Sequence, residues 1–196
     1  MAAIPECGGY IVFDPVLCTG CQTCELVCSA YKSGGKTRPT LSRIQVVREP
    51  LGDTIHNCEP KACRQCQDPK CMAACPVEGA MYIDEETRAR CIDEEECIGC
   101  SMCIEACGSY YEPPRIVFDV ERGKALKCDL CGGDPQCVKW CPNGALKYIT
   151  LSEMKEAGWK YEQEFYEPYA KDFGPDFTRH EGYKLTFEKL YPHKQK

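Results

Sequence analysis

Residues 18–28 read CTGCQTCELVC and residues 97–107 read CIGCSMCIEAC, so the spacing C-x2-C-x2-C-x3-C occurs twice in this chain. Two stretched versions accompany it, CRQCQDPKCMAAC at 63–75 and CDLCGGDPQCVKWC at 128–141. Together the four motifs hold sixteen of the nineteen cysteines. Each iron of a 4Fe–4S cluster takes one thiolate, and each motif supplies four. The sequence therefore predicts four 4Fe–4S clusters and a role in electron transfer.

The spacing suits this chemistry. A C-x2-C-x2-C loop brings three sulfurs onto three irons, and we expect a helix to begin near the fourth cysteine. In the bacterial ferredoxin pattern that fourth cysteine binds the other cluster of a pair. Proline follows Cys75 and Cys141, as in that pattern, whereas Ser29 follows Cys28 and Gly108 follows Cys107.

Two other uses of cysteine compete with this prediction. Disulfide scaffolds are small and secreted, and no signal peptide is visible in MAAIPECGGYIVFDP. Zinc takes four ligands in two pairs, which leaves the third cysteine of each triplet unexplained. Cys7, Cys58 and Cys91 lie outside the four motifs. We expect them to be small buried apolar residues with inert thiols.

Charge and hydropathy limit the possible partners and the possible location of the protein. The formal net charge is −6, and four clusters at −2 each would bring the loaded protein to about −14. Nucleic acid is therefore an unfavourable partner. No run approaches the roughly 18 apolar residues of a membrane helix, so we expect no direct membrane insertion. Reduced thiols favour a cytoplasmic protein, although export together with a signal-bearing partner would leave no trace here.

A common local order surrounds the motifs. Short strands rich in β-branched or aromatic residues are expected at 10–13, 80–83, 115–120 and 145–150. This order predicts an α+β fold made of tandem bacterial ferredoxin-like lobes. Spacing does not decide which motifs pair, because 21 residues separate Cys75 from Cys97 and 20 separate Cys107 from Cys128.

A family resemblance decides the pairing. The phrases CRQCQDPKC, CIGCSMC and KCDLCGGDPQCVKWCPNGAL resemble the four-cluster electron-transfer subunits of molybdenum and tungsten oxidoreductases, among them the iron–sulfur subunit of dimethyl sulfoxide reductase. The likeness covers about residues 7 to 150. It implies that each triplet is completed by the fourth cysteine of another motif. The implied ligand sets are Cys18, Cys21, Cys24 and Cys141; Cys63, Cys66, Cys71 and Cys107; Cys97, Cys100, Cys103 and Cys75; and Cys128, Cys131, Cys137 and Cys28.

The same resemblance implies that one lobe is nested inside the other. The inner lobe would span 58–110, the outer lobe 1–57 and 111–150, and an extended C-terminal arm 151–196. The arm has no cysteine but holds ten of the nineteen aromatic residues, so it must bury its rings, either on its own lobes or on a partner.

A finer resemblance concerns CTGCQTCELVCS and the PTLSRI segment at 39–44. Both look like the small iron–sulfur subunits that accompany tungsten enzymes of the aldehyde oxidoreductase family, such as tungsten benzoyl-CoA reductase. This implies a subunit that is not catalytic by itself and relays single electrons to or from a large tungsten- or molybdenum-pterin subunit of a soluble complex. A flavin, NAD or ferredoxin partner on the other side stays open. The alternative is a free, diffusible polyferredoxin.

Other features receive plainer interpretations. The acidic segment 84–96 is expected to be a solvated face, and Lys124 and Lys127 to be exposed lysines beside the fourth motif, the alternative being that their charge raises the potential of that cluster. The three histidines show no ligand spacing. Gly132 and Gly133 are expected to form a turn, since the chain contains no nucleotide-binding glycine motif.

Overall fold

The computed structural model describes residues 4–13, 17–48 and 58–156. His56, His180, His193 and the aromatic residues of the arm lie outside these ranges. The described residues form short strands and short helices, in agreement with a mixed α/β ferredoxin-type fold. The strands are β1 (Gly9–Phe13), β2 (Gln45–Arg48), β3 (Cys58–Lys61), β4 (Met81–Ile83), β5 (Arg90–Ile92), β6 (Ile116–Asp119), β7 (Lys124–Lys127) and β8 (Leu146–Thr150).

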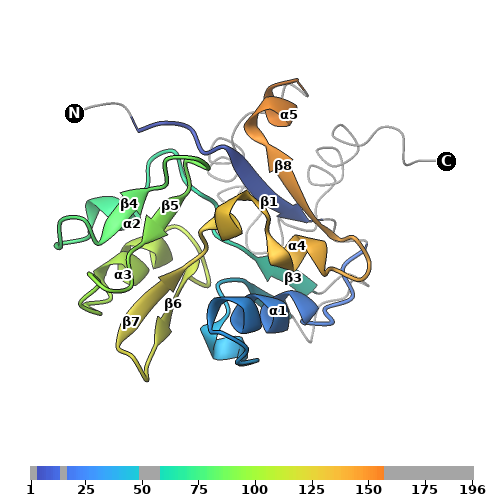
Figure 1. Ribbon diagram of the computed structural model, residues 1–196, viewed down its shortest axis with the longest axis horizontal. Helices are drawn as coiled ribbons and strands as arrows, with labels where there is room; N and C mark the ends of the chain where they lie inside the picture. Colours follow the sequence, from blue (N-terminus) through green and yellow to red (C-terminus); the bar gives the residue numbers. More distant parts are fainter. Residues whose placement is uncertain (1–3, 14–16, 49–57, 157–196) are drawn as a thin grey trace. The chain divides into compact units, whose positions relative to one another are not determined.

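The strands pair two by two. The pairs β2–β3, β4–β5 and β6–β7 are antiparallel neighbours, and β1 lies beside β8, as Figure 1 shows. The predicted strands at 10–13, 80–83, 115–120 and 145–150 are confirmed as β1, β4, β6 and β8. Because β1 and β8 pair, the segment preceding the first motif is joined to the segment following the fourth motif.

The helices begin earlier than the sequence predicts. Each starts one residue before the third cysteine of its motif, not near the fourth. The bounds are α1 (Thr23–Lys32), α2 (Lys70–Ala73), α3 (Met102–Gly108) and α4 (Gln136–Lys139), with α5 (Leu151–Glu156) later in the chain and 3-10 turns at Pro39–Leu41 and Leu130–Gly133. Four residues of helix rise about 6 Å. The third and fourth cysteines are therefore set apart along the axes of α1 and α3, whereas Cys75 and Cys141 lie beyond the ends of α2 and α4.

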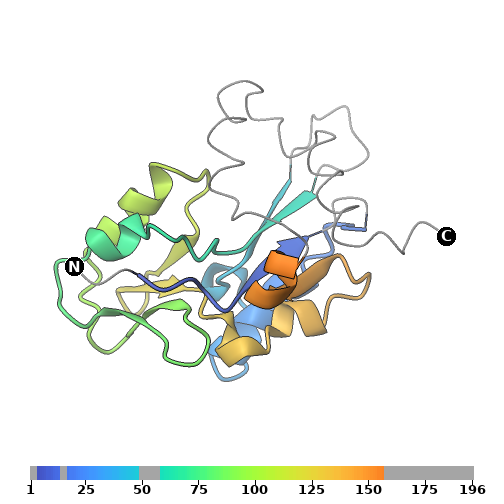
Figure 2. The ribbon, with the colours of Figure 1, turned by 90° about the horizontal axis from the view of Figure 1, so that it is seen from above.

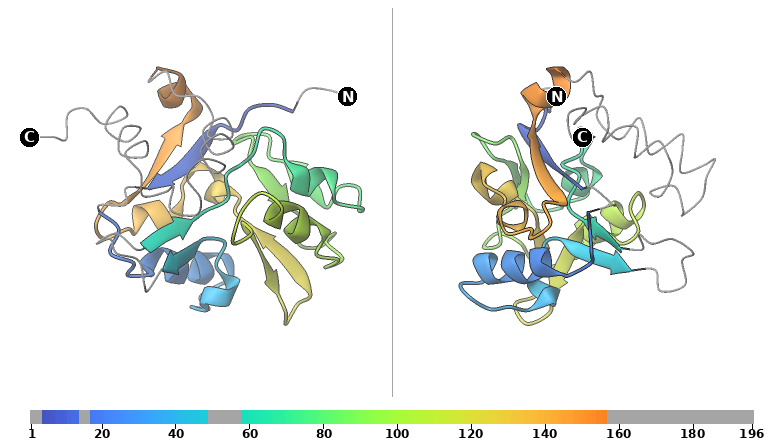
Figure 3. Two further views of the ribbon diagram at one scale, coloured as in Figure 1. Left: turned by 180° about the vertical axis from the view of Figure 1, so that it is seen from behind. Right: turned by 90° about the vertical axis from the view of Figure 1, so that its right-hand side faces the viewer.

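Helices from different motifs pack together. α1 packs against α4, and α2 packs against α3, which lies beside it in Figure 2. The yellow β6–β7 hairpin in Figure 3 adjoins α3. Each helix pair thus brings together two cysteine motifs that are separate in the sequence.

Cysteines make up part of the hydrophobic core. Cys103, Ile116 and Ala125 form one buried cluster, and Cys71 and Cys97 pack against it with other partly buried apolar residues. β1 is buried along its whole length. Within the described ranges, no helix has the length and apolar character needed to cross a membrane.

Candidate metal centres

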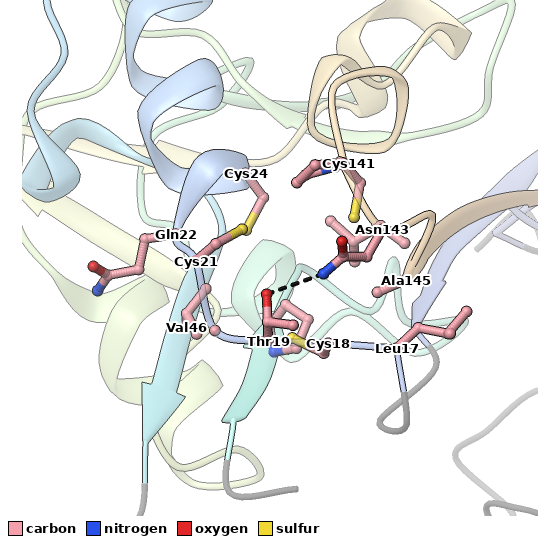
Figure 4. Close-up of a pocket in the computed structure, with 14 residues that line it drawn as sticks. Leu17, Cys18, Thr19, Cys21, Gln22, Cys24, Val46, Cys141, Asn143 and Ala145 are labelled. Carbon is pink, nitrogen blue, oxygen red and sulfur yellow. Dashed lines mark hydrogen bonds between the residues drawn. The ribbon is translucent and has the colours of Figure 1, made fainter.

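The first motif lines a pocket together with the last cysteine of the fourth motif. Cys18 and Cys21 face this pocket from the loop before α1, Cys24 faces it from the first turn of α1, and Cys141 faces it from the segment after α4 (Figure 4). At the edge of the pocket the Asn143 amide donates to the Thr19 hydroxyl at 3.0 Å. We call these four cysteines site 1.

The third motif lines a similar pocket with the last cysteine of the second motif. Cys97, Cys100 and Cys103 line it together with Cys75. Ile98, which also lines this pocket, is 66% exposed. We call these four cysteines site 3. Both pockets therefore combine three cysteines of one motif with one cysteine of another.

The remaining eight cysteines gather in two further groups. Burial raises the pKa of the Cys71 thiol to about 12, and the neighbouring thiols of Cys63, Cys107 and Cys66 act in the same direction. We call these four cysteines site 2. Burial also raises the pKa of the Cys137 thiol, and Cys28 and Cys131 add to the rise. Site 4 consists of Cys128, Cys131, Cys137 and Cys28.

Left-handed backbone shapes every cysteine loop. In all four motifs, the residue before the second cysteine has a positive φ: 64° at Gly20, 51° at Gln65, 70° at Gly99 and 59° at Leu130. Such turns direct successive backbone N–H groups into one concave surface, which binds anions. Glycine occupies only two of the four positions, so the turn is kept in the other two despite its steric cost. The loops therefore fit a cluster of net negative charge.

Several backbone amides donate to cysteine sulfur. The N–H of Arg43 donates to Cys28 at 3.3 Å and the N–H of Arg115 donates to Cys107 at 3.2 Å. The N–H of Gln65 donates to the sulfur of Cys63 at 3.4 Å. Donors aimed at sulfur stabilise thiolates, the form in which cysteine binds iron. These contacts fall on sites 2 and 4, and sequence reasoning did not single them out.

Burial favours the protonated thiol at Cys24 and Cys103. It raises the pKa of Cys24 to about 12 and that of Cys103 to about 11. A cluster must therefore displace protons when it binds these sites, and its bonds to iron must offset the burial of charge. Loading is thus coupled to proton release.

The sites differ from a site for one metal ion. Within the described ranges, no group of three or more His, Cys, Asp or Glu side chains is suited to hold a single ion. Sulfur ligands of one tetrahedral ion lie about 3.8 Å apart when the metal–sulfur distance is about 2.3 Å. Ligands of a 4Fe–4S cluster each bind a different iron and stand further apart.

Three predictions about other residues have mixed outcomes. Cys7 and Cys91 are buried, at 0% and 3% exposure, as the sequence predicts. Cys58 is only partly buried, so the prediction of burial is wrong there. It lies against the first cysteine loop, since a β-carbon on Gly20 would sit 2.3 Å from its sulfur. Gly132 and Gly133 adopt positive φ, which confirms the predicted turn.

The charged segments also depart from expectation. Lys127 is 5% exposed, so its predicted exposure is wrong, because β7 carries it into the interior. The acidic segment is not wholly solvated. Glu94 pairs with Arg43 and with Arg122, which ties the segment to two other parts of the chain.

These sites define a ferredoxin-type iron–sulfur protein. A family model described as a 4Fe-4S dicluster domain matches residues 55–150. The chain is 39% identical over 144 residues to the polyferredoxin-like subunit of an aliphatic sulfonate oxidoreductase of Pyrococcus furiosus, covering 72% of this chain and 78% of that subunit. It is 34% identical over 159 residues to a subunit of the anaerobic dimethyl sulfoxide reductase of Haemophilus influenzae, covering 73% of this chain and 74% of that subunit. This protein belongs to the same family of iron–sulfur electron-transfer subunits of oxidoreductases.

Two further proteins are similar to this chain over different shares of their own length. The chain is 39% identical over 145 residues to the beta subunit of NADH-dependent phenylglyoxylate dehydrogenase of Aromatoleum evansii, covering 74% of this chain and 31% of that subunit. This chain therefore spans about a third of that relative. A solved structure of the BamBC active-site complex of benzoyl coenzyme A reductase aligns at 26% identity with a TM-score of 0.41, covering 92% of this chain and 96% of that one.

Proposed function

We propose that sites 1 to 4 each bind one 4Fe–4S cluster through the four cysteines assigned to them above. The observation that carries this proposal is the lining of the two pockets: three cysteines of one motif face the fourth cysteine of another. The grouped thiols of sites 2 and 4 support the same rule. The packing of α1 on α4 and of α2 on α3 supports the inner lobe at 58–110 and the outer lobe at 1–57 and 111–150.

We infer that the chain relays single electrons and is not catalytic by itself. Each cluster supplies a one-electron couple between the 2+ and 1+ states. All four ligand positions of each site are cysteines, so the protein reserves no iron for substrate. The loops hold the thiolates and supply N–H donors, and no cysteine of sites 2 and 4 is exposed. Solvent-exposed Cys21 and Cys100 make sites 1 and 3 the natural points of electron entry and exit.

We propose a large tungsten- or molybdenum-pterin subunit as the partner, in a complex of the aldehyde oxidoreductase type. The support is the sequence likeness at residues 18–44 together with the oxidoreductase relatives. The other electron partner would be a flavin, NAD-linked or ferredoxin protein. We place this complex in the cytoplasm, because sixteen reduced thiols require a reducing compartment.

Anaerobic purification of the untagged chain from its own cells tests both parts. Sixteen irons and sixteen sulfides per chain are expected, and a homogeneous sample with about twelve of each would contradict four clusters. A large subunit carrying tungsten or molybdenum should copurify. Elution of the 22.1 kDa chain alone, with its clusters complete, would favour the diffusible polyferredoxin instead.

A further inference from the structure

Lys127 is a buried cation between two of the candidate cluster sites. It ends β7, directly before Cys128 of site 4, and its side chain is almost fully removed from solvent. Its ammonium group donates to the backbone carbonyl of Arg90, whose N–H donates to the side chain of Gln65, between Cys63 and Cys66 of site 2. One positive charge therefore lies beside both sites.

The charge of Lys127 has no carboxylate partner within the described part of the chain. The ion pairs found there involve other lysines and arginines. An ammonium group buried without a counter-ion is unfavourable, so something else must balance it. The iron-bound thiolates and the net negative charge of the clusters in sites 2 and 4 would supply that balance.

A buried polar network fixes the ammonium group in place. Gln65 is fully buried, and its side-chain amide donates to the carbonyl of Cys128 at 2.8 Å. The N–H of Arg90 donates to the side-chain oxygen of Gln65 at 2.8 Å. Lys127 donates to the carbonyl of that same arginine. The network joins the second motif, β5 and the fourth motif, so Lys127 cannot swing toward solvent without breaking it.

We propose that Lys127 is a positioning residue that raises the reduction potentials of the clusters in sites 2 and 4. The inference rests on the proposed function. Reduction adds one negative charge to a cluster, and a fixed positive charge nearby favours that more negative state. Burial strengthens the effect, because the interior screens charge less than water does. At sites 1 and 3, exposed Cys21 and Cys100 leave the clusters open to solvent screening.

Redox titration followed by electron paramagnetic resonance, on the anaerobic full-length holoprotein, tests this inference. In Lys127→Gln, two of the four midpoint potentials should become more negative by at least the equivalent of a tenfold change in equilibrium constant, about 59 mV for one electron. The other two should stay within a few millivolts. Lys139→Gln is the matched control, because Lys139 lies between Cys137 and Cys141 of the same motif but its side chain is 57% exposed. That variant should leave all four potentials nearly unchanged.

Two outcomes would overturn the proposal: four unmoved potentials in Lys127→Gln with full iron, or an equal shift in Lys139→Gln. If Lys127→Gln loses iron, Lys127→Arg decides, since it keeps the charge. Lys127→Arg should retain iron and near-wild-type potentials, and full iron with the potentials of sites 2 and 4 still lowered would also overturn the proposal. The iron content and partner of the wild-type protein are separate measurements, so a failure of the proposed function is recognised independently.

Discussion

Sites 1 and 3 open to solvent, whereas the cysteines of sites 2 and 4, the enclosed sites, are buried or partly buried. Each open site has one exposed cysteine, Cys21 or Cys100, and the enclosed sites have none. The enclosed sites receive amide donors to Cys28 and Cys63, and the buried Lys127 lies beside them. The open sites are built on the compact first and third motifs, and the enclosed sites on the stretched second and fourth motifs. The difference teaches that the exposure of a site changes together with the spacing of its cysteines.

The largest expected effect follows from removing a ligand that crosses between motifs. Cys75→Ala should abolish the cluster of site 3 and lower the iron content from sixteen toward twelve per chain, because Cys75 shares a pocket with Cys97, Cys100 and Cys103. Iron analysis and the cluster absorbance measure this. Cys91→Ser is the control, since buried Cys91 lines neither pocket and should leave all sixteen irons. A Cys75→Ala protein with full iron would contradict the pairing across motifs.

The next effect concerns the loop of an open site. Gly99 has φ of +70°, and a β-carbon there would lie 2.0 Å from the carbonyl oxygen of Gly123. Gly99→Ala should lower apparent stability by about 3 kcal/mol, because the β6–β7 turn must move. Gly132 has φ of +68° with nothing within 4 Å, so Gly132→Ala should cost only the left-handed strain, about 1 kcal/mol. Anaerobic urea denaturation compares the two, and equal losses would rule out the clash.

Gln65 and Asn143 allow the hydrogen bonds of a buried side chain to be compared with the hydrogen bond of an exposed one. Gln65→Leu leaves the carbonyl of Cys128 and the N–H of Arg90 without their side-chain partner, at about 1–3 kcal/mol for each buried group. Asn143→Ala removes the exposed bond to Thr19 at the rim of site 1, and should cost under about 1 kcal/mol. Urea midpoints of the two holoproteins give the difference. A larger loss of stability in Asn143→Ala than in Gln65→Leu would contradict this prediction.

The smallest effect is expected at a surface ion pair. Arg122 is half exposed and pairs with Asp119 at 2.5 Å and with Glu94 at 2.7 Å. Arg122→Ala should cost about 0.5 kcal/mol, because solvent screens the pairs and Glu94 keeps Arg43. The loss of stability in Arg122→Ala should be smaller at high salt, which the urea midpoint measures. A loss as large as that of Gln65→Leu would mean that this segment supports the interior.

Much of the site was predictable, and the reason is chemical. Iron–sulfur clusters are bound by cysteines at characteristic spacings. The motifs and the family resemblance therefore imply which cysteines lie near Cys71 and Cys137. The four strands follow from short β-branched runs next to those loops. The fourth cysteine does not reveal where the helix of each motif begins. The left-handed turns end before the third cysteine, so the helix can begin there.

The surroundings of the sites were not predictable. Lys127 reads like any lysine beside a loop, and only the pairing of β6 with β7 carries it inward. Gln65 has no propensity for the left-handed region that would reveal its turn, and its amide partners come from β5 and the fourth motif. Such contacts depend on segments distant in sequence, which local patterns do not encode.

The pocket of site 1 has a consequence for how the protein is made. Its first three cysteines leave the ribosome long before Cys141, the fourth to line the pocket. At about 5–20 residues per second, that delay is on the order of ten seconds. Throughout this interval the nascent polypeptide carries three reactive sulfurs without their closing partner. A reducing compartment, which keeps these thiols from oxidising, therefore protects the subunit while it is being made.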